Sequence, residues 1–513
     1  MGQLTEFNEV YERLRASSKD WKRISIVKES LSTIVRDILR YLPSPKAFKY
    51  IGSTESGSMT KMGRDIDCLL AFEPYSSDLF RESLMNHGTL ENMVFRKSDV
   101  VPDIATAFYG GEKIGFIGIE YGKDPLNDLQ GDVWLHPSFS RQHLDRTQVR
   151  DVVLGKILFH VLGIPKKHFG GGFTIEQLIS QYGNFENLLN EFSRSKKIYV
   201  DFSTKYRGQS NLLVVTYPFC GLKNLAESFT AEELQVISDY SKRILDSPKL
   251  FLEDSVTMFN RNLWSERAKK LGSSEAFSSP DIYLTRKENR IVNKLLRKIL
   301  PRRILDLGCA NGYSTIGMTR GLDSEIIGLD NNSDAIRFAK RFAREKHNTS
   351  FVIGNMDSLD FENGYFDVVI LKRALENMTS RDSQSRVINE VGRVLKEGGK
   401  LYLFDATQDS INKISDLREA YGLPGLTQQN HTYVLSEELL LKIVKDSFYL
   451  ERIIDKTSTY HFITRILYPL AFRVMGKDMD KLRFDTSLHR ISSFLPSLGG
   501  LGLYKLYQFR KNE

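Results

Sequence analysis

The sequence predicts a multidomain α/β protein in which an α+β domain and a helical region precede a domain with a parallel sheet. Three observations support this fold class. The chain has 513 residues, which is too long for one ordinary hydrophobic core. An apolar stretch at 66–72 follows a Gly/Ser turn, as a strand of a small sheet would. From residue 303 to residue 405, strand and helix patterns alternate, which is typical of parallel sheets.

Composition is that of a soluble globular protein, with 41% apolar and 27% charged residues. The net charge of +8 is compatible with polyanionic partners such as nucleotides, RNA or acidic lipid surfaces. The first residues are polar and no run approaches the ~18 apolar residues that span a bilayer, so we expect no signal peptide, no transmembrane segment and a cytoplasmic location. The three cysteines are far apart without metal-ligand spacing, so we expect no zinc site.

The first half of the chain divides into two predicted domains, 1–145 and 146–265. In the first, helical periodicity at 1–42 ends at a Pro-Ser-Pro sequence, and short strands follow at 49–51 and 66–72. In the second, helices are expected at 147–163, 174–192 and 230–249, with strands of a small sheet within 197–217.

The turn Gly52-Ser-Thr-Glu-Ser-Gly-Ser58 precedes two carboxylates, Asp65 and Asp67, on the apolar strand. Residues two apart on a strand point to the same face. Two carboxylates so placed can hold the Mg²⁺ ions that bridge a nucleoside triphosphate, and the turn can offer backbone N–H groups to the phosphates. The alternative is a solvated turn before a strand with surface aspartates.

This pattern resembles the polymerase-β-type nucleotidyltransferases, and the order of features from 49 to 250 is similar to the archaeal (class I) CCA-adding tRNA nucleotidyltransferases. The resemblance implies a polymerase-β-like α+β domain with a CCA-adding-like central region. It also implies metal binding by Asp65 and Asp67 as catalytic residues, with ATP or CTP as substrate. The implied nucleotide-binding residues are Gly52, Ser53, Lys156 and Lys223.

The chain departs from that family at the third metal-binding carboxylate. Gly115 falls where the family has this carboxylate, on a later strand. Glu120 has the other strand parity and is not a simple replacement, whereas Asp132 is a second possible substitute. Without a third carboxylate, the 3′-hydroxyl of the acceptor lacks an activating metal ligand, and the domain could only bind. The family's C-terminal tRNA-gripping domains are also replaced by the second half of this chain.

The stretch 266–285 contains Gly-Ser-Ser and Ser-Ser-Pro sequences and is predicted to be a linker. The final domain is expected at 286–513. Its predicted strands are 303–307, 325–330, 350–354, 366–371 and 400–405, and its predicted helices are 313–322, 332–346 and 382–395.

Within this domain, the sequence Arg303-Ile-Leu-Asp-Leu-Gly-Cys-Ala-Asn-Gly312 is a strand that leads into a glycine turn and a helix. Gly308 and Gly312 allow close approach of a ligand to the backbone. Asp330 ends the next strand, where a carboxylate can bind ribose hydroxyls, and Asp357 follows the third. Neither a GxGxxG pattern nor a P-loop lysine is present, which favours an adenosyl cofactor over a dinucleotide.

Together these features resemble the class I S-adenosylmethionine-dependent methyltransferases, which have a Rossmann-like fold. The resemblance implies that Asp306, Gly308 and Gly312 surround the methionine part, Asp330 binds the ribose, and Met356 and Asp357 flank the adenine. The family usually has glycine where Ala310 stands, which is a mild departure. The alternative is a Rossmann-like domain that has lost its cofactor.

The methyl acceptor is less specified. A general base is needed only for weakly acidic acceptors, and the candidates are Glu376, His431 and Tyr433, each better explained as a structural polar residue than as a base. The aromatic and basic tail 465–513 suits either a packed C-terminal cap or contact with a membrane surface or acceptor.

The sequence therefore predicts a bifunctional enzyme that carries a methyltransferase and a metal-dependent nucleotidyltransferase, acting on RNA such as tRNA 3′ ends. Two alternatives stay open. Both transfers act on a small molecule or glycan, or the first half is a degenerate nucleotide-binding module attached to an active methyltransferase.

Overall fold

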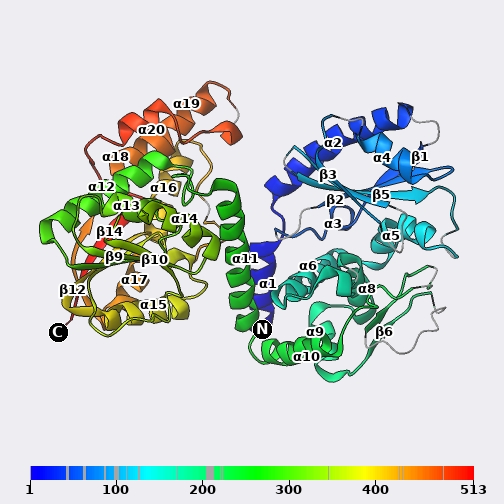
Figure 1. The fold of residues 1–513 in the computed structure, drawn as a ribbon, viewed down its shortest axis with the longest axis horizontal. Helices are drawn as coiled ribbons and strands as arrows, with labels where there is room; N and C mark the ends of the chain where they lie inside the picture. Colours follow the sequence, from blue (N-terminus) through cyan, green and yellow to red (C-terminus); the bar gives the residue numbers. More distant parts are fainter. Residues whose placement is uncertain are drawn as a thin grey trace. The chain divides into compact units, whose positions relative to one another are not determined.

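A computed structural model describes most of the chain, which divides into two compact units, Met1–Met258 and Phe259–Glu513 (Figure 1). The described residues are 2–41, 45–61, 65–85, 88–97, 103–110, 112–124, 127–169, 171–203, 213–219, 221, 223–344, 346–426, 428–429, 431–477 and 479–512.

The first unit contains a five-stranded mixed sheet and a group of helices. Its elements are α1 (Gly2–Leu14), α2 (Ser18–Tyr41), β1 (Pro45–Ile51), α3 (Ser53–Ser56), β2 (Ile66–Phe72), α4 (Ser77–Met85), β3 (Glu91–Arg96), β4 (Asp103–Tyr109), β5 (Glu112–Glu120), α5 (Leu129–His143), α6 (Arg146–Val161), α7 (Lys166–Phe169), α8 (Gly172–Tyr182), α9 (Phe185–Arg194), β6 (Ile198–Val200), β7 (Leu213–Val215), α10 (Ala231–Asp246) and the first part of α11 (Pro248–Leu271).

The sheet of the first unit has the strand order β1-β2-β5-β4-β3, in which only β2 and β5 run parallel. Alternate residues of β2 point to opposite faces. Ile66, Cys68 and Leu70 pack with α2 and α4 in one core, whereas Leu69 and Ala71 pack with α5 on the other face. Asp65 and Asp67 share the parity of Leu69, so the sheet directs them toward the α5 side.

The helical part of the first unit is more broken than the periodicity predicts. The segment expected as one helix at 174–192 forms α8 and α9, separated at Gly183 and Asn184. Gly183 has a φ of 87°, which ends α8, and the Asn184 side chain accepts a hydrogen bond from Asn187 N and caps α9. The strands expected within 197–217 are found as the short parallel pair β6 and β7.

The second unit is built on a seven-stranded sheet with the order β10-β9-β8-β11-β12-β14-β13. Its elements after α11 are α12 (Ile282–Ile299), β8 (Arg303–Leu307), α13 (Tyr313–Met318), β9 (Glu325–Asp330), α14 (Ser333–Ala343), β10 (Thr349–Ile353), β11 (Phe366–Lys372), η1 (Leu375–Asn377), α15 (Arg381–Val394), β12 (Leu395–Ala406), α16 (Gln408–Ala420), α17 (Glu437–Val444), β13 (Phe448–Ile454), α18 (Ser458–His461), η2 (Phe462–Leu467), α19 (Tyr468–Val474), η3 (Met479–Lys481), α20 (Ser487–Ser492) and β14 (Tyr504–Lys511).

The strands β8 to β12 are parallel and are covered by helices on both faces. One core joins the sheet to α15 and α17, and the other joins it to α12. Chain order runs outward from β8 in one direction to β10 and in the other through β11 to β12. Open α/β sheets bind ligands at the carboxyl ends of the strands where the order reverses, which here is the edge next to β8 and β11.

Two expected boundaries differ from the structure. The predicted linker 266–285 belongs to the second unit, because α11 continues to Leu271 and Phe277 packs in a core with Ala268 and Ala335. The end of the tail is a strand instead of a cap, since β14 lies antiparallel between β12 and β13 and its residues 506–509 are buried. None of the described helices combines the length and apolar character that a membrane span requires.

Candidate functional site

The turn between β8 and α13 requires glycine at two positions. Gly308 and Gly312 have φ angles of 74° and 77°, which favour glycine. A Cβ atom added to Gly308 would lie 2.6 Å from Ala374 Cβ, and one added to Gly312 would lie 2.7 Å from Phe351 Cζ. The turn is therefore pressed closely against β10 and the segment that follows β11.

Asp330, the last residue of β9, is fixed by this turn. Its Oδ2 accepts a hydrogen bond from Ala310 N, and its Oδ1 accepts one from Asn332 N, both at 2.9 Å. Ala310 adopts a φ of 51°, which aims its N–H at the carboxylate. Burial raises the pKa of Asp330, and the backbone N–H groups oppose that rise. The carboxylate is thus held in a single orientation beside the glycine turn.

Asp306 lies inside β8, with 2% of its surface exposed. Thr315 Oγ1 donates to its Oδ2 at 2.6 Å. Burial raises the pKa of Asp306 to about 6, against the opposing effects of Thr315 and Lys372. A group with this pKa is ionised at neutral pH but becomes neutral under mildly acidic conditions.

Met356 and Asp357 follow β10 and differ in their surroundings. Met356 reaches the glycine turn, because its Sδ lies 3.6 Å from the position of a Cβ on Gly308. Asp357 Oδ2 lies 3.7 Å from Arg386 Nη2 of α15. The structure therefore gathers Asp306, Gly308, Gly312, Asp330 and Met356 around one turn, and it directs Asp357 toward α15.

Glu376, in η1 after the end of β11, and Asp405, the next-to-last residue of β12, form a carboxylate pair. Burial raises the pKa of Glu376 to about 7 and raises that of Asp405 well above its usual value, and the charge of Glu376 adds to the shift of Asp405. The positive charge of Arg373 opposes the rise in the pKa of both carboxyl groups. A carboxyl group with a pKa near 7 has the property of a general base at neutral pH, although the same shift follows from burial alone.

Glu288 of α12 joins this region to β11 and was not singled out by the sequence patterns. It is fully buried and accepts from Arg373 Nη2 at 2.5 Å and from Lys372 Nζ at 3.3 Å. Because the neighbouring carboxyl groups have raised pKa values, Glu288 is the main counter-charge for the two cations. Helical spacing alone gives no signal for such a role.

The other two candidate bases are less suited to proton transfer. Burial lowers the pKa of His431 to about 4, and Trp264 packs edge-on against its ring. Tyr433 N donates to the backbone oxygen of Glu376 at 2.6 Å, so the residue's backbone supports the loop that carries Glu376.

In the first unit, Gly52 and Asp67 approach each other closely. A Cβ on Gly52 would lie 2.8 Å from Asp67 Oδ2, so the Gly-Ser turn meets the carboxylate, and Ser53 begins α3 directly after it. Burial raises the pKa of Asp67 to about 6, with a further rise from Asp65 and opposing effects from nearby lysines. The structure thus brings Gly52, Ser53, Asp65 and Asp67 together.

The expected position of a third carboxylate is taken by glycine. In the parallel pairing of β2 and β5, Gly115 lies opposite Asp67, and a Cβ there would lie 2.5 Å from Asp67 Oδ1. Lys113, which shares the strand parity of Gly115, forms an ion pair with Asp65 at 2.7 Å. Across the described residues, no three His, Cys, Asp or Glu side chains are grouped to hold a metal ion.

The two other carboxylates considered for this position, Glu120 and Asp132, have partners of their own. Glu120 is at the other end of β5, opposite Phe72, and pairs with Lys123 at 3.0 Å. Asp132 lies on α5, where its Oδ2 accepts from Phe219 N at 2.8 Å. Neither residue joins Asp65 and Asp67 in a three-residue metal-binding group among the described residues, and the third ligand stays unassigned.

Lys156 and Lys223 have separate environments. Burial lowers the pKa of Lys156, whose Nζ lies 2.5 Å from Ser58 Oγ and 3.5 Å from Glu176 Oε1. Asp67 is close enough to oppose that shift, so Lys156 borders the aspartate site. Lys223 pairs with Glu227 at 3.8 Å.

The two halves of the chain are similar to different known proteins. A family model described as "Methyltransferase domain" matches residues 302–458. The CCA-adding enzyme of Thermoplasma acidophilum is 24% identical over 256 residues, which cover 48% of this chain and 58% of the enzyme. The ubiquinone/menaquinone biosynthesis C-methyltransferase of Yersinia pestis is 30% identical over 125 residues, covering 23% of this chain and 49% of the enzyme. The chain thus spans about half the length of these curated relatives.

Among solved structures, a SAM-dependent methyltransferase from Methanosarcina mazei is 22% identical, with a TM-score of 0.28, and the match covers 41% of this chain and 92% of that one. The methyltransferase prediction for the second half is confirmed by the family match. Residues 302–458, which contain the five parallel strands β8 to β12, match a methyltransferase domain.

Proposed function

We propose that the second unit transfers a methyl group from S-adenosylmethionine, and that the glycine turn with Asp330 carries this assignment. The sulfonium supplies an activated methyl group, so the protein's task is to position it and exclude water. Asp306 would accept the ammonium group of the methionine part beside Gly308 and Gly312. The fixed carboxylate of Asp330 would accept from the ribose hydroxyls, and Met356 and Asp357 would flank the adenine.

We propose RNA with a tRNA-like 3′ end as the acceptor. The support is the similarity of the first half to CCA-adding enzymes, whose name describes the addition of CCA. Covalent fusion of two units is economical when both act on one molecule. A second observation is the net charge of +8, which suits a polyanion.

For the first unit we propose metal-dependent nucleotidyl transfer from ATP or CTP. Asp65 and Asp67 fit one Mg²⁺ ion, because this ion commonly uses one or two carboxylates together with substrate phosphates. Gly52 and Ser53 would face the triphosphate, with Lys156 beside it, and Lys223 would contact the base. Mg²⁺ would neutralise phosphate charge in this arrangement.

Gly115 and Lys113 favour a second candidate function for this unit. Among the described residues, β5 places a glycine opposite Asp67 and a lysine against Asp65, where a third carboxylate would help to activate an acceptor hydroxyl through a metal. The unit would then bind nucleotide or an RNA end without transferring a nucleotide, and would position the substrate of the methyltransferase.

The similarity to a quinone-pathway C-methyltransferase favours a small-molecule or glycan acceptor as the competing function of the second unit. Labelled-methyl transfer from S-adenosylmethionine into a whole-cell extract, followed by fractionation, separates the two. We expect label in RNA that RNase releases, and none with Asp330→Asn. Label that resists RNase and extracts as a small molecule would exclude the RNA acceptor.

Nucleotidyl transfer is tested with labelled ATP and CTP and total tRNA. Incorporation that is lost in Asp65→Ala supports an active transferase. No incorporation, together with nucleotide binding that Asp67→Asn weakens, supports the binding function instead.

A further inference from the structure

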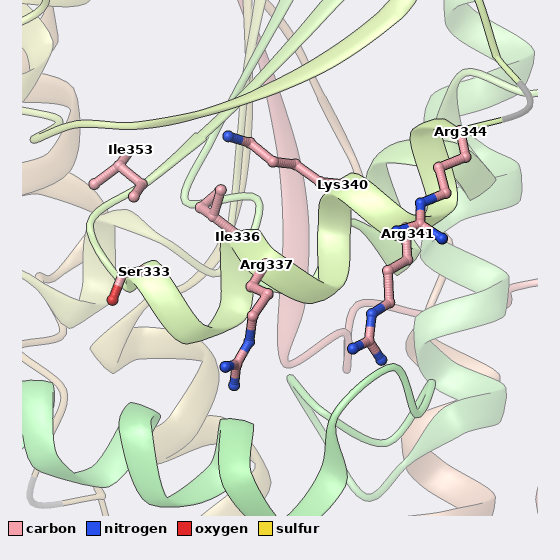
Figure 2. A pocket seen from close by; sticks show the side chains of 7 residues that line it. All are labelled: Ser333, Ile336, Arg337, Lys340, Arg341, Arg344 and Ile353. Atoms are coloured by element: carbon pink, nitrogen blue, oxygen red, sulfur yellow. The ribbon is translucent and has the colours of Figure 1, made fainter.

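One exposed face of α14 carries a row of cations. The row consists of Arg337, Lys340, Arg341 and Arg344, the last of which is the C-cap residue directly after α14. They occupy positions i, i+3, i+4 and i+7, which lie on one side of a helix, and all four are exposed. The row spans about 10 Å along the helix axis at 1.5 Å per residue. With Ser333, Ile336 and Ile353 these side chains line a cavity of about 440 Å³ (Figure 2).

The charges on this face are largely unbalanced. Of the four cations, only Arg337 forms an ion pair among the described residues, with Asp334 at 3.1 Å. The guanidinium groups of Arg337 and Arg341 lie 5.4 and 5.0 Å from the ring of Phe338, which restricts them, and Figure 2 shows both extending in the same direction from α14. Lys340 extends toward the side of Ile353.

The cavity borders the expected adenosine site. Ile353 lies opposite Asp330 in the parallel pairing of β10 and β9, and Gly354 N donates to the backbone oxygen of Asp330 at 3.1 Å. Ser333 begins α14 one residue after Asn332, whose N–H contacts the Asp330 carboxylate. A polyanion on this face would therefore lie at the edge of the methyl-transfer site.

We propose that the α14 face, defined by Arg337, Lys340, Arg341 and Arg344, binds the phosphate backbone of the RNA acceptor. A row of cations with little compensating negative charge suits a chain of phosphates better than a single one. The only strongly exposed apolar side chain in the cavity lining is Ile353, whereas a membrane-binding face needs several apolar anchors. The inference rests on the proposed RNA acceptor.

The test compares two triple variants of the full chain by fluorescence anisotropy with a tRNA transcript. Lys340→Glu/Arg341→Glu/Arg344→Glu reverses the α14 face. The control, Lys294→Glu/Lys298→Glu/Lys442→Glu, makes the same change in net charge at exposed lysines of α12 and α17. We expect tRNA binding to be at least tenfold weaker in the first variant and less than threefold weaker in the control. In the first variant, the slope of log affinity against log salt concentration should also fall in magnitude by about 2 to 3.

Binding of S-adenosylhomocysteine should be unchanged in the α14 variant, which shows that the domain is folded. Equal weakening of both variants, or tRNA binding unaffected by the α14 change, would overturn the inference. If the α14 variant lost binding to vesicles containing anionic lipid but kept its tRNA binding, the inference would also be overturned. If methyl label never enters RNA but the α14 variant still loses tRNA binding, RNA is not the acceptor, and the α14 face remains a site that binds RNA phosphates.

Discussion

Replacing Glu288 by Gln should destabilise the second unit strongly, because it removes the main counter-charge of two buried cations. The side chains of Lys372 and Arg373 are 6% and 11% exposed, and that of Glu288 is fully buried. Removing one partner of a buried ion pair typically costs about 3–5 kcal/mol. We expect about 3 kcal/mol, the lower end, because Glu376 lies close to Arg373 and can ionise to replace part of the lost charge.

Hydrogen exchange of the amides in β8 and β11 measures this loss within the second unit. A loss of about 3 kcal/mol should accelerate their exchange by about two orders of magnitude. Glu266→Gln provides the control, since Glu266 is 73% exposed in its pair with Lys269 and should contribute less than about 1 kcal/mol. If Glu288→Gln and Glu266→Gln change the exchange rates equally, the reasoning about the buried charges is refuted.

Four further predictions concern the two sites. Affinity for S-adenosylhomocysteine should rise as pH increases through about 6, because Asp306 must be ionised to accept an ammonium group; Asp306→Asn should flatten this profile, and a steep profile in that variant would contradict the assignment. The raised pKa of Asp306 also means that the folded state favours the neutral acid. In urea titrations, the stability of the wild type relative to Asp306→Asn should therefore decrease as the pH rises from about 4 to about 6. Gly308→Ala should reduce the affinity for S-adenosylhomocysteine at least tenfold, because the added Cβ would lie 2.6 Å from Ala374 Cβ on a backbone with a strained φ. Normal binding in calorimetry would refute this close packing. Lys113→Met should tighten Mn²⁺ binding several-fold in paramagnetic titrations by freeing Asp65, and unchanged affinity would exclude Asp65 as a ligand.

The parts of the fold that the sequence predicts well are those with strong local signals. The strand at 66–72 is a mostly apolar run, β8 ends directly before Gly308, and β9 ends at Asp330. Each of these signals lies within ten residues, and the turn that follows β8 needs glycine for steric reasons. The grouping of Asp306, Gly308 and Asp330 follows because parallel strands end at the same edge of a sheet.

The features that sequence reasoning missed depend on distant partners. Residues 504–511 belong to the tail predicted as an aromatic and basic cap, yet they form a strand with a buried centre because β12 and β13 pair with both of its edges. The predicted linker 266–285 gains its packing from Ala335 in α14. Glu288 is recognisable as a counter-charge only once α12 lies against the end of β11, and the pairing of Lys113 with Asp65 needs the register of β2 and β5.

Calorimetric titration of the full chain with S-adenosylhomocysteine tests the central claim most directly, namely that the second unit binds an adenosyl methyl donor through Asp330. We predict saturable one-to-one binding in the wild type and at least tenfold weaker binding in Asp330→Asn, which keeps the side-chain shape but loses charge-assisted hydrogen bonds to the ribose. Absence of binding to the wild type, or equal affinity in Asp330→Asn, would contradict the account.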